Sequence, residues 1–463
     1  MPDSRTLVTP TDGMIITSDT TLAPGTYLLP KGISITADNV TLDGAGATII
    51  GGGPEGVGVT VDGRTGVTIK NLSVKSYYHG IRAKGCKGLL VENNTVRDTQ
   101  EVEHDTIFLD IWLKPEEAYG GGIMLWKCED SKVIGNDIQH QMNGLLTYFC
   151  SRLDVRENCA SYSSGFGIHL FATCDSVFEC NWADYCCRFE TRGNKINEYD
   201  PDKQDFRYGH MGADATGFLI IHGSCRNVFR RNLARLGGDG FFLAGLSPER
   251  EKVGCNDNLF EENDASLSPN IAFEATFSSG NIFRNNYADR CNYGFWLGFS
   301  WDNVIEGNRM VMNRQAGIAV ENGHGFTVKG NNFQANGHGV LLWSHYAPEW
   351  DEAFPDHKTS HHWTIEENTF TRNGTGIRIA KDQDHGIRNY SEEKRGPEDT
   401  RPHDHIIRKN DIQDNRIGIE LREIDATIVE GNILNKNVES NLRLDDCKDT
   451  KPINNLGSAG AYL

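Results

Sequence analysis

Two glutamates occupy similar places in two similar segments, and together they could perform acid–base chemistry. Glu274 follows the apolar run 271–273, and Glu321 closes the segment 317–321, Gly-Ile-Ala-Val-Glu. In a strand, side chains alternate between the two faces, so both carboxylates are predicted to point outward. We expect them in one column with Gly298 between them. Two strand spacings are about 9.6 Å, and inverting glycosidases hold their carboxyl groups about 6.5–9.5 Å apart. The pattern therefore predicts an acid and a base on either side of a glycosidic bond, without saying which is which.

Asp239 and Asp214 form a rival pair. Asp239 lies in the glycine-rich stretch 236–242, and Asp214 precedes it by 25 residues, about the length of one repeat. Stacked carboxylates would raise the pKa of one of them, which suits a catalytic acid. His169 is a third candidate, as an acid, a base or a hydrogen-bond donor.

Aromatic and cationic side chains are expected around these groups. Outward rings beside carboxylates are typical of sites that stack against sugar faces, and histidines near the late loops could bond sugar hydroxyls. Arginines could bind a carboxylate or phosphate on the substrate. The predicted substrate-binding residues are Trp126, Phe171, Phe242, Trp296, His338, Trp343, His345, Arg378 and Arg422.

Histidines gather late in the chain, and eight of fifteen lie between His338 and His405. The run 403–405, His-Asp-His, could be part of a metal site. No HExxH motif or paired Cys/His spacing accompanies it. We therefore expect no metal and no cofactor. The twelve cysteines are interpreted as structural, reduced thiols.

A repeat positions all of these residues. Two apolar residues, two others and then Asn recur with steps of 22 or 23 residues in seven of twelve intervals. The aligned residues are Asn71, Asn94, Asn136, Asn158, Asn181, Asn232, Asn263, Asn286, Asn308, Asn331, Asn368, Asn410 and Asn432. We expect each Asn to adopt left-handed backbone angles at a turn and to bond the Asn of the next coil. A strand motif of Gly, apolar, any, apolar precedes many of them, as at 122–126 and 294–298. A fixed period of this length indicates stacked coils.

The Asn ladder, the coil period and the opening segments 25–29 and 39–44 resemble the right-handed parallel β-helix superfamily, the pectate-lyase-like fold. The resemblance covers roughly residues 15–450. It implies an all-β, single-domain right-handed parallel β-helix of about thirteen or fourteen coils. We expect a cap at 1–30, the β-helix at 31–447 and a tail at 448–463.

Five oversize steps contain insertions. They fall at residues 99–119, 187–213, 246–254, 345–361 and 381–404, on either side of the Gly-apolar strand. Long loops on a rigid scaffold commonly carry function. We expect these loops to wall one groove above that strand stack.

Composition limits the partners. The 463 residues carry a net charge of −18, which argues against nucleic acid and anionic membranes as partners. No apolar run approaches the ~20 residues of a membrane span. The N-terminus lacks the pattern of a signal peptide, so we expect a cytoplasmic protein, with secretion after loss of a leader as the alternative.

The resemblance and the candidate residues together predict a carbohydrate-active enzyme that cleaves or transfers a glycosidic bond of a short glycan, as a glycoside hydrolase or fructotransferase-like enzyme. A polysaccharide lyase or uronate epimerase that uses His169, Arg378 or Arg422 is one alternative. A non-catalytic glycan-binding protein is another. The expected partner is an oligosaccharide or polysaccharide, and a homo-oligomer is left open.

Overall fold

The computed structural model describes residues 6–102, 106, 109–190, 199–200, 205–206, 210–211, 215–344, 346, 348, 352–381 and 400–457. The chain divides into two compact units, Met1–Phe242 (unit 1) and Leu243–Leu463 (unit 2). The boundary falls inside strand β26, Asp239–Ala244. The described residues are almost entirely strands and turns, with no α-helix among them.

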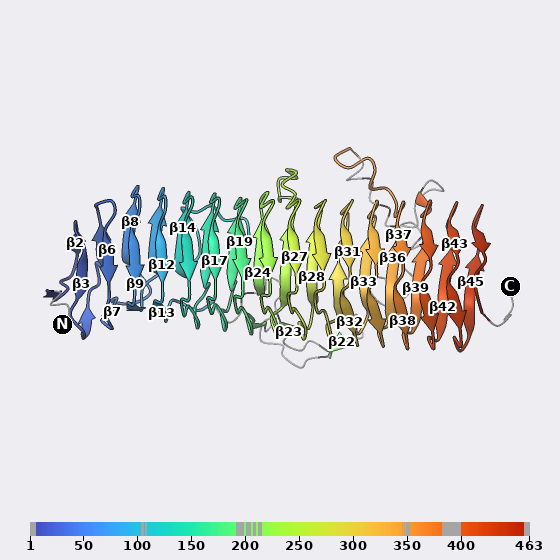
Figure 1. The fold of residues 1–463 in the computed structure, drawn as a ribbon, viewed down its shortest axis with the longest axis horizontal. Helices are drawn as coiled ribbons and strands as arrows, with labels where there is room; N and C mark the ends of the chain where they lie inside the picture. The colour runs from blue at the N-terminus through green and yellow to red at the C-terminus, as the bar shows by residue number, and fades with distance from the viewer. Residues whose placement is uncertain are drawn as a thin grey trace, which may run out of the picture. The chain divides into compact units, whose positions relative to one another are not determined.

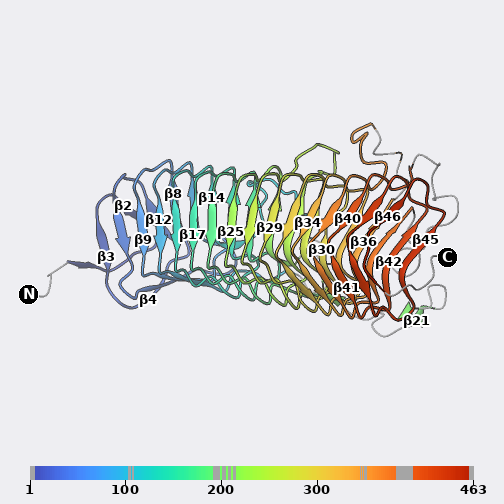
Figure 2. The same ribbon diagram turned by 45° about the vertical axis from the view of Figure 1, so that its right-hand side comes forward.

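Each coil of unit 1 contributes one strand to a parallel sheet that we call the long-strand sheet. Its strands lie side by side in chain order (Figures 1 and 2). They are β2 (Met14–Ile16), β5 (Ile33–Ile35), β8 (Val57–Asp62), β11 (His79–Lys84), β14 (Gly121–Trp126), β16 (Leu145–Tyr148), β18 (Ile168–Phe171), β24 (Thr216–Ile221) and the start of β26.

The other strands of unit 1 are short. A second parallel sheet, the short-strand sheet, contains β1 (Leu7–Val8), β3 (Thr20–Leu22), β6 (Thr41–Asp43), β9 (Thr68–Lys70), β12 (Leu90–Glu92), β15 (Lys132–Ile134), β17 (Asp154–Arg156), β19 (Val177–Glu179) and β25 (Val228–Arg230). A third sheet contains β4 (Thr26–Leu28), β7 (Thr48–Ile50), β10 (Ser73–Lys75) and β13 (Thr95–Arg97). Two antiparallel pairs are β20 (Phe189–Glu190) with β23 (His210–Met211) and β21 (Tyr199–Asp200) with β22 (Asp205–Phe206).

Unit 2 repeats the three-sheet plan. Its long-strand sheet contains β28 (Ile271–Thr276), β30 (Tyr293–Trp296), β33 (Ala316–Glu321), β36 (His338–Trp343), β39 (Thr375–Ala380), β42 (Ile417–Arg422) and β45 (Ser440–Asp445). Its short-strand sheet contains β27 (Leu259–Glu261), β29 (Ile282–Arg284), β31 (Val304–Glu306), β34 (Thr327–Lys329), β37 (Thr364–Glu366), β40 (Ile406–Arg408), β43 (Ile428–Glu430) and β46 (Lys451–Ile453). The third sheet contains β32 (Arg309–Val311), β35 (Asn332–Gln334), β38 (Thr369–Thr371), β41 (Asp411–Gln413) and β44 (Ile433–Asn435).

The interior of each unit is built from stacked apolar side chains. In unit 1 the rings of Phe218 and Phe241 stack with centroids 4.7 Å apart. In unit 2 Phe273 and Phe295 stack at 4.9 Å. Burying one such ring contributes about 1.5–3 kcal/mol relative to leaving it exposed. The expected parallel β-helix is confirmed.

The Asn ladder is confirmed as well. In unit 1, Asn136 Nδ2 donates to Asn158 Oδ1 across 2.9 Å, and in unit 2 Asn308 Nδ2 donates to Asn331 Oδ1 across 3.1 Å. The expected left-handed backbone at the ladder Asn is wrong, because the residue before it has the positive φ, as at Arg231 and Glu367. Asn71 is itself such a turn residue, and Leu72 occupies the ladder position that pairs with Asn94.

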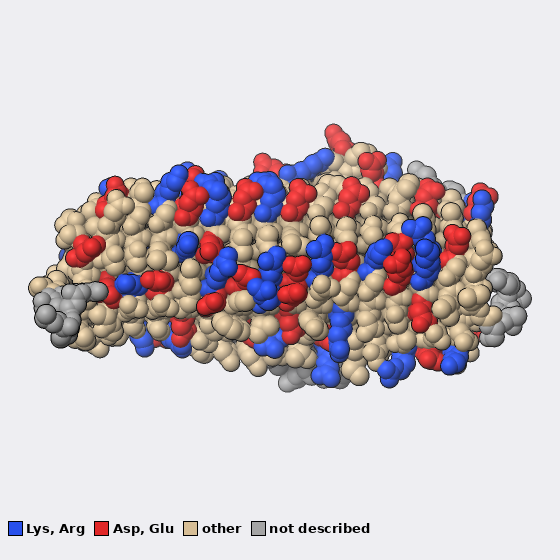
Figure 3. All heavy atoms as spheres, viewed as in Figure 1, with Lys and Arg blue, Asp and Glu red and all other residues tan. Residues whose placement is uncertain are grey.

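Acidic and basic side chains are interleaved over the face seen in Figure 3. In unit 1, Arg156 Nη1 lies 2.7 Å from Glu179 Oε2, and in unit 2 Arg408 Nη2 lies 2.7 Å from Glu366 Oε2. In both pairs the arginine is partly exposed and the glutamate is buried. Among the described residues there is no helix long and apolar enough to cross a membrane.

Candidate functional site

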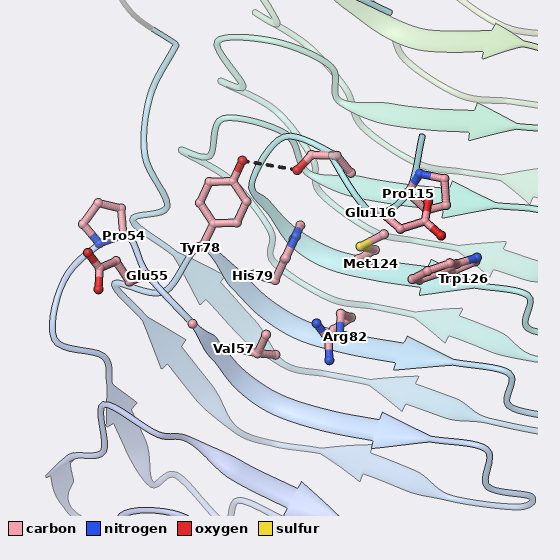
Figure 4. A pocket seen from close by; sticks show the side chains of 12 residues that line it. Pro54, Glu55, Val57, Tyr78, His79, Arg82, Pro115, Glu116, Met124 and Trp126 are labelled. Carbon is pink, nitrogen blue, oxygen red and sulfur yellow. Dashed lines mark hydrogen bonds between the residues drawn. The ribbon is translucent and has the colours of Figure 1, made fainter. Parts of the chain in front are cut away.

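A pocket of about 470 Å³ opens on the outward face of the long-strand sheet of unit 1 (Figure 4). Its walls come from three successive coils and from one insertion. The lining residues are Pro54, Glu55, Gly56, Val57, Tyr78, His79, Arg82, Pro115, Glu116, Ala118, Met124 and Trp126. Pro115, Glu116 and Ala118 belong to the insertion at 99–119, which was expected to wall a groove.

Strand register brings the floor of the pocket together. Parallel pairing sets Arg82 of β11 beside Met124 of β14. It also sets Lys84 beside Trp126. Because side chains on alternate residues share a face, Arg82 and Lys84 point outward together. Arg82 and Trp126 therefore lie on adjacent strands, and Trp126 is two residues further along its strand than the residue that pairs with Arg82.

Three polar atoms in the pocket wall are shielded from solvent and have no hydrogen-bond partner within the described part of the chain. They are Nδ1 of His79, Nε of Arg82 and Nε1 of Trp126. A buried polar atom left unsatisfied costs about 1–3 kcal/mol. Two of these atoms are donors only, and the imidazole nitrogen can donate or accept. A ligand rich in hydrogen-bond acceptors would satisfy them once the side chains that cover them move aside.

Charge is distributed unevenly around the pocket. Arg82 Nη2 lies 3.9 Å from Asp62 Oδ2, beyond hydrogen-bond distance. Burial, and then the positive charge of Arg82, lower the pKa of His79 to about 4. The imidazole is therefore neutral at pH 7. The Lys84 ammonium lies 3.7 Å from the centroid of the Trp126 ring, a cation–π contact.

Of the residues predicted to bind substrate, Trp126 lines this pocket. The sequence interpretation missed Tyr78, His79 and Arg82. The sequence does contain the pattern that identifies this strand. The segment 80–84, Gly-Ile-Arg-Ala-Lys, has the same Gly-apolar-any-apolar pattern as the later strands. The parity rule applied one coil earlier would have found Arg82.

The other predicted residues of unit 1 lie elsewhere in that unit. His169 is 1% exposed between the rings of Tyr148 and Phe166, with centroids at 5.0 and 5.4 Å. Burial lowers its pKa to about 3. Phe171 and Asp239 are buried too, and Phe242 is half-buried. Asp214 lies outside the described residues.

The expected column of Glu274 and Glu321 is wrong. Glu274 pairs with Trp296, and Trp296 pairs with Ala319, two residues before Glu321. The two glutamates therefore belong to neighbouring columns of the outward face of unit 2. Strand geometry separates their Cα atoms by about 12 Å rather than 9.6 Å. The prediction failed because Ala272 replaces the glycine that marks the register in the neighbouring strands.

The rings of unit 2 form a packed cluster, which we call the outward aromatic cluster. Trp343 is completely buried, and its centroid lies 5.4 Å from that of Trp296. Trp296 in turn lies 4.9 Å from Tyr293. The cluster also contains Ile271, Ala316, Ala319 and Leu341. A ring buried by protein is not free to stack on a sugar, so Trp343 does not present the open face that was predicted.

The cationic and imidazole residues predicted in unit 2 are also engaged. The Arg378 guanidinium contacts the Glu420 carboxylate, and Arg422 Nε lies 3.5 Å from Asp445 Oδ2. Burial, and then Arg378, lower the pKa of His338 to about 4. His345 lies outside the described residues.

The sequence matches the family described as "Right handed beta helix region" over residues 31–234, 212–350 and 357–459. The chain belongs to the right-handed β-helix family. A comparison with curated proteins gave no match.

Solved structures with a similar trace were found at low identity. The mannuronan C-5 epimerase AlgE6 A-module of Azotobacter vinelandii is 13% identical, over 94% of this chain and 91% of that one, with a TM-score of 0.41. DFA-IIIase from Arthrobacter chlorophenolicus A6 is 10% identical, over 66% and 69%, with a TM-score of 0.38. The Dettilon tailspike protein is 13% identical, over 80% and 58%, with a TM-score of 0.39. Likeness at this level does not bear on the activity of this chain.

Proposed function

We propose that this chain is a carbohydrate-active enzyme whose unit 1 pocket binds an acidic sugar and removes the proton next to its carboxylate. The observation that carries the proposal is the group of unsatisfied polar atoms in that pocket: His79 Nδ1, Arg82 Nε and Trp126 Nε1. A uronate supplies a carboxylate and several hydroxyls, which are acceptors for the Arg82 and Trp126 donors. The half-buried indole of Trp126 provides apolar surface beside a sugar ring.

Each residue has a distinct role in this reaction. The guanidinium of Arg82 binds the carboxylate and stabilises the negative charge that develops on it. Neutral His79 accepts the proton from the adjacent carbon. The bound carboxylate lies beside the imidazole and offsets the effect of Arg82, so that substrate raises the pKa of His79.

Two outcomes follow from the same first step. The electron pair left by the proton is delocalised into the carboxylate held by Arg82. Delivery of a solvent proton to the opposite face of that carbon inverts its configuration, as in an epimerase. Expulsion of the glycosidic oxygen, which takes up a solvent proton, from the neighbouring carbon instead gives a double bond, as in a lyase. In both cases His79 then releases its proton to solvent. The proposal covers this reaction class, and the experiment decides between its members.

Hydrolysis of a glycosidic bond is the second candidate, because two carboxylates also line the pocket. Glu55 and Glu116 lie at opposite sides of it in Figure 4. Both side chains are exposed. These two glutamates share one pocket, whereas Glu274 and Glu321 lie in different columns and Glu321 is buried.

The test is a reaction in D2O with uronate polysaccharides. Deuterium incorporation at C5, followed by NMR, reports removal of the proton, and absorbance near 235 nm reports the double bond of a lyase product. We expect deuterium incorporation that Arg82→Met and His79→Asn abolish. Arg64→Met, outside the pocket, serves as the matched control. New reducing ends without deuterium or absorbance would instead establish hydrolysis, and no reaction across neutral and acidic glycans would refute both candidates.

A further inference from the structure

A column of stacked imidazoles runs along one turn of unit 2. His324, His361 and His403 occupy equivalent positions in successive coils and are joined by parallel bridges. The His324 and His361 ring centroids are 4.6 Å apart, and those of His361 and His403 are 5.1 Å apart. Interplanar angles of 3° in both pairs make this a regular stack. The turn therefore fixes the direction of each ring.

The next position of the turn adds two further ligand groups. His362 follows His361, and Asp404 follows His403, one coil apart. Both residues have the left-handed backbone of this turn, with φ of 54° and 56°. The ligand atoms of His362, His403 and Asp404 all lie within 4.8 Å of one another. The fold thus brings two imidazoles and a carboxylate together from segments about forty residues apart in the sequence.

Hydrogen bonding determines which nitrogen of His362 is available. His361 Nε2 lies 3.0 Å from the carbonyl oxygen of Asp356, which only accepts, so Nε2 carries the proton. In this tautomer Nδ1 of His361 is the acceptor. His362 Nδ1, at 2.7 Å, must then be the donor. The lone pair of His362 therefore sits on Nε2, and this nitrogen lies 3.9 Å from Asp404 Oδ2.

His403 has the complementary arrangement. Its Nδ1 lies 2.7 Å from Asp404 Oδ2, where it donates to the carboxylate. The other nitrogen of a neutral ring then carries a lone pair. His362 and Asp404 are partly exposed, with side-chain exposures of 62% and 46%, and His403 is 35% exposed. A cation could therefore reach all three side chains from solvent.

We propose that His362, His403 and Asp404 bind one divalent transition-metal ion of the Zn²⁺ type. Imidazole and carboxylate ligands suit Zn²⁺, Co²⁺ and Ni²⁺ better than Ca²⁺, which prefers oxygen ligands alone. Three protein ligands leave one tetrahedral position for water or a small ligand. His361, held by the Asp356 carbonyl, orients His362 in the way that outer partners commonly orient ligating histidines. This proposal differs from the expectation of no metal that the sequence motifs suggest.

The neighbouring histidines are consistent with a built site rather than a solvated surface cluster. His324 Nε2 is buried and has no hydrogen-bond partner among the residues that the structure describes. His357 lies 4.7 Å from the His324 ring and 5.0 Å from Trp301, measured between centroids. These rings pack behind the stack and restrict its movement, which reduces the ordering cost of binding an ion.

The proposal is tested by titrating the full-length protein with Zn²⁺ by calorimetry and with Co²⁺ by visible absorption. We expect one saturable equivalent per chain. His362→Gln and Asp404→Asn should each weaken binding by at least tenfold, and His403→Gln should do the same. His140→Gln in unit 1, where His140 stacks on Tyr162 at 4.9 Å, is the matched control and should bind as the unchanged protein does.

Folding and thiol binding are checked in the same samples. The melting temperature of each variant without metal shows whether it folds, and Zn²⁺ should raise the melting temperature of the unchanged protein but not that of Asp404→Asn. A Co²⁺ spectrum with thiolate charge-transfer bands would place the ion on cysteines instead. That result, an absence of saturable binding, or equal affinity in the His403→Gln and control proteins would overturn the proposal.

Discussion

The indole Nε1 of Trp343 donates a hydrogen bond to Oε2 of Glu321 across 3.1 Å. The two residues pair in register on β36 and β33, and both are buried, with exposures of 0% and 5%. A buried carboxylate needs donors. Trp343 therefore serves Glu321 as a structural partner, which differs from the sugar platform expected from the sequence.

Replacing Trp343 with Phe should destabilise unit 2. A hydrogen bond to a charged group is worth about 1.5–3 kcal/mol, and the lost ring volume adds to this. Trp363→Phe is the matched control, since its buried indole donates to the neutral carbonyl of Gly323 at 2.8 Å and should cost less. Urea unfolding of the two variants measures the difference. Equal losses would mean that Glu321 is satisfied without Trp343.

Removing one step of the Asn ladder should cost more than a typical surface change. The side chain of Asn308 donates to Asn331 Oδ1 and to the Phe283 carbonyl, and its Oδ1 accepts from Asn286. Asn308→Ala leaves several buried groups unpaired, at about 1–3 kcal/mol each. Thermal unfolding should show a large loss of stability in Asn308→Ala. Asn285, the residue before Asn286, is exposed and has a positive φ, so Asn285→Gly should change stability little. Similar melting temperatures for both variants would contradict a structural role for the ladder.

The stacking of coils and the Asn ladder are features that can be predicted from the sequence. The period and the recurrent Asn determine that coils stack, because backbone and amide groups must pair with the next coil. The alternation then identifies which residues of a strand face outward. These properties are local, so each coil could be interpreted by itself. The outward position of Trp126 followed correctly from them.

Register and burial could not be obtained in this way. Gly317 allows no Cβ, since one there would lie 2.7 Å from Phe333 Cδ1, but the equivalent residue in β28 is Ala272. Without the glycine marker, the sequence pattern predicts a register that is two residues out of place and puts Glu274 in the wrong column. Burial of Trp343 depends on side chains that pack over the outward face, and alternation within a strand does not report them.

Stability should fall as the pH falls, because several histidines are neutral and buried. Burial lowers the pKa of His169 to about 3, below the value of about 6.5 in an unfolded chain. Between these values the unfolded state binds more protons, so stability decreases from pH 6.5 downward. From pH 7 to pH 5 one such residue contributes about 2 kcal/mol to this loss.

The variant His169→Phe isolates that contribution. Phe fits among the rings of Tyr148 and Phe166 and does not titrate. Unfolding at pH 8 should change little, while the drop in stability between pH 7 and pH 5 should be smaller than in the unchanged protein. His140→Phe, at an exposed histidine, should leave the pH dependence as it was. If both variants lose stability equally with acid, His169 is not neutral in the folded state.

Arg82 should discriminate acidic from neutral sugars, and its geometry should matter as well as its charge. The guanidinium presents a planar set of donors that matches a carboxylate, whereas an ammonium is a point charge. Arg82→Lys keeps the positive charge beside Asp62 but loses Nε, the atom that has no partner in the pocket. We expect calorimetry to show uronate oligosaccharides binding about tenfold more weakly, a loss of about 1.4 kcal/mol in binding free energy.

Neutral oligosaccharides of equal length should bind both proteins alike. Arg97→Lys, whose guanidinium contacts Asp137 away from the pocket, should leave uronate affinity unchanged. Because the pocket charge is partly exposed, uronate affinity should also fall with added salt. Unchanged uronate affinity in Arg82→Lys would show that this guanidinium does not hold the carboxylate.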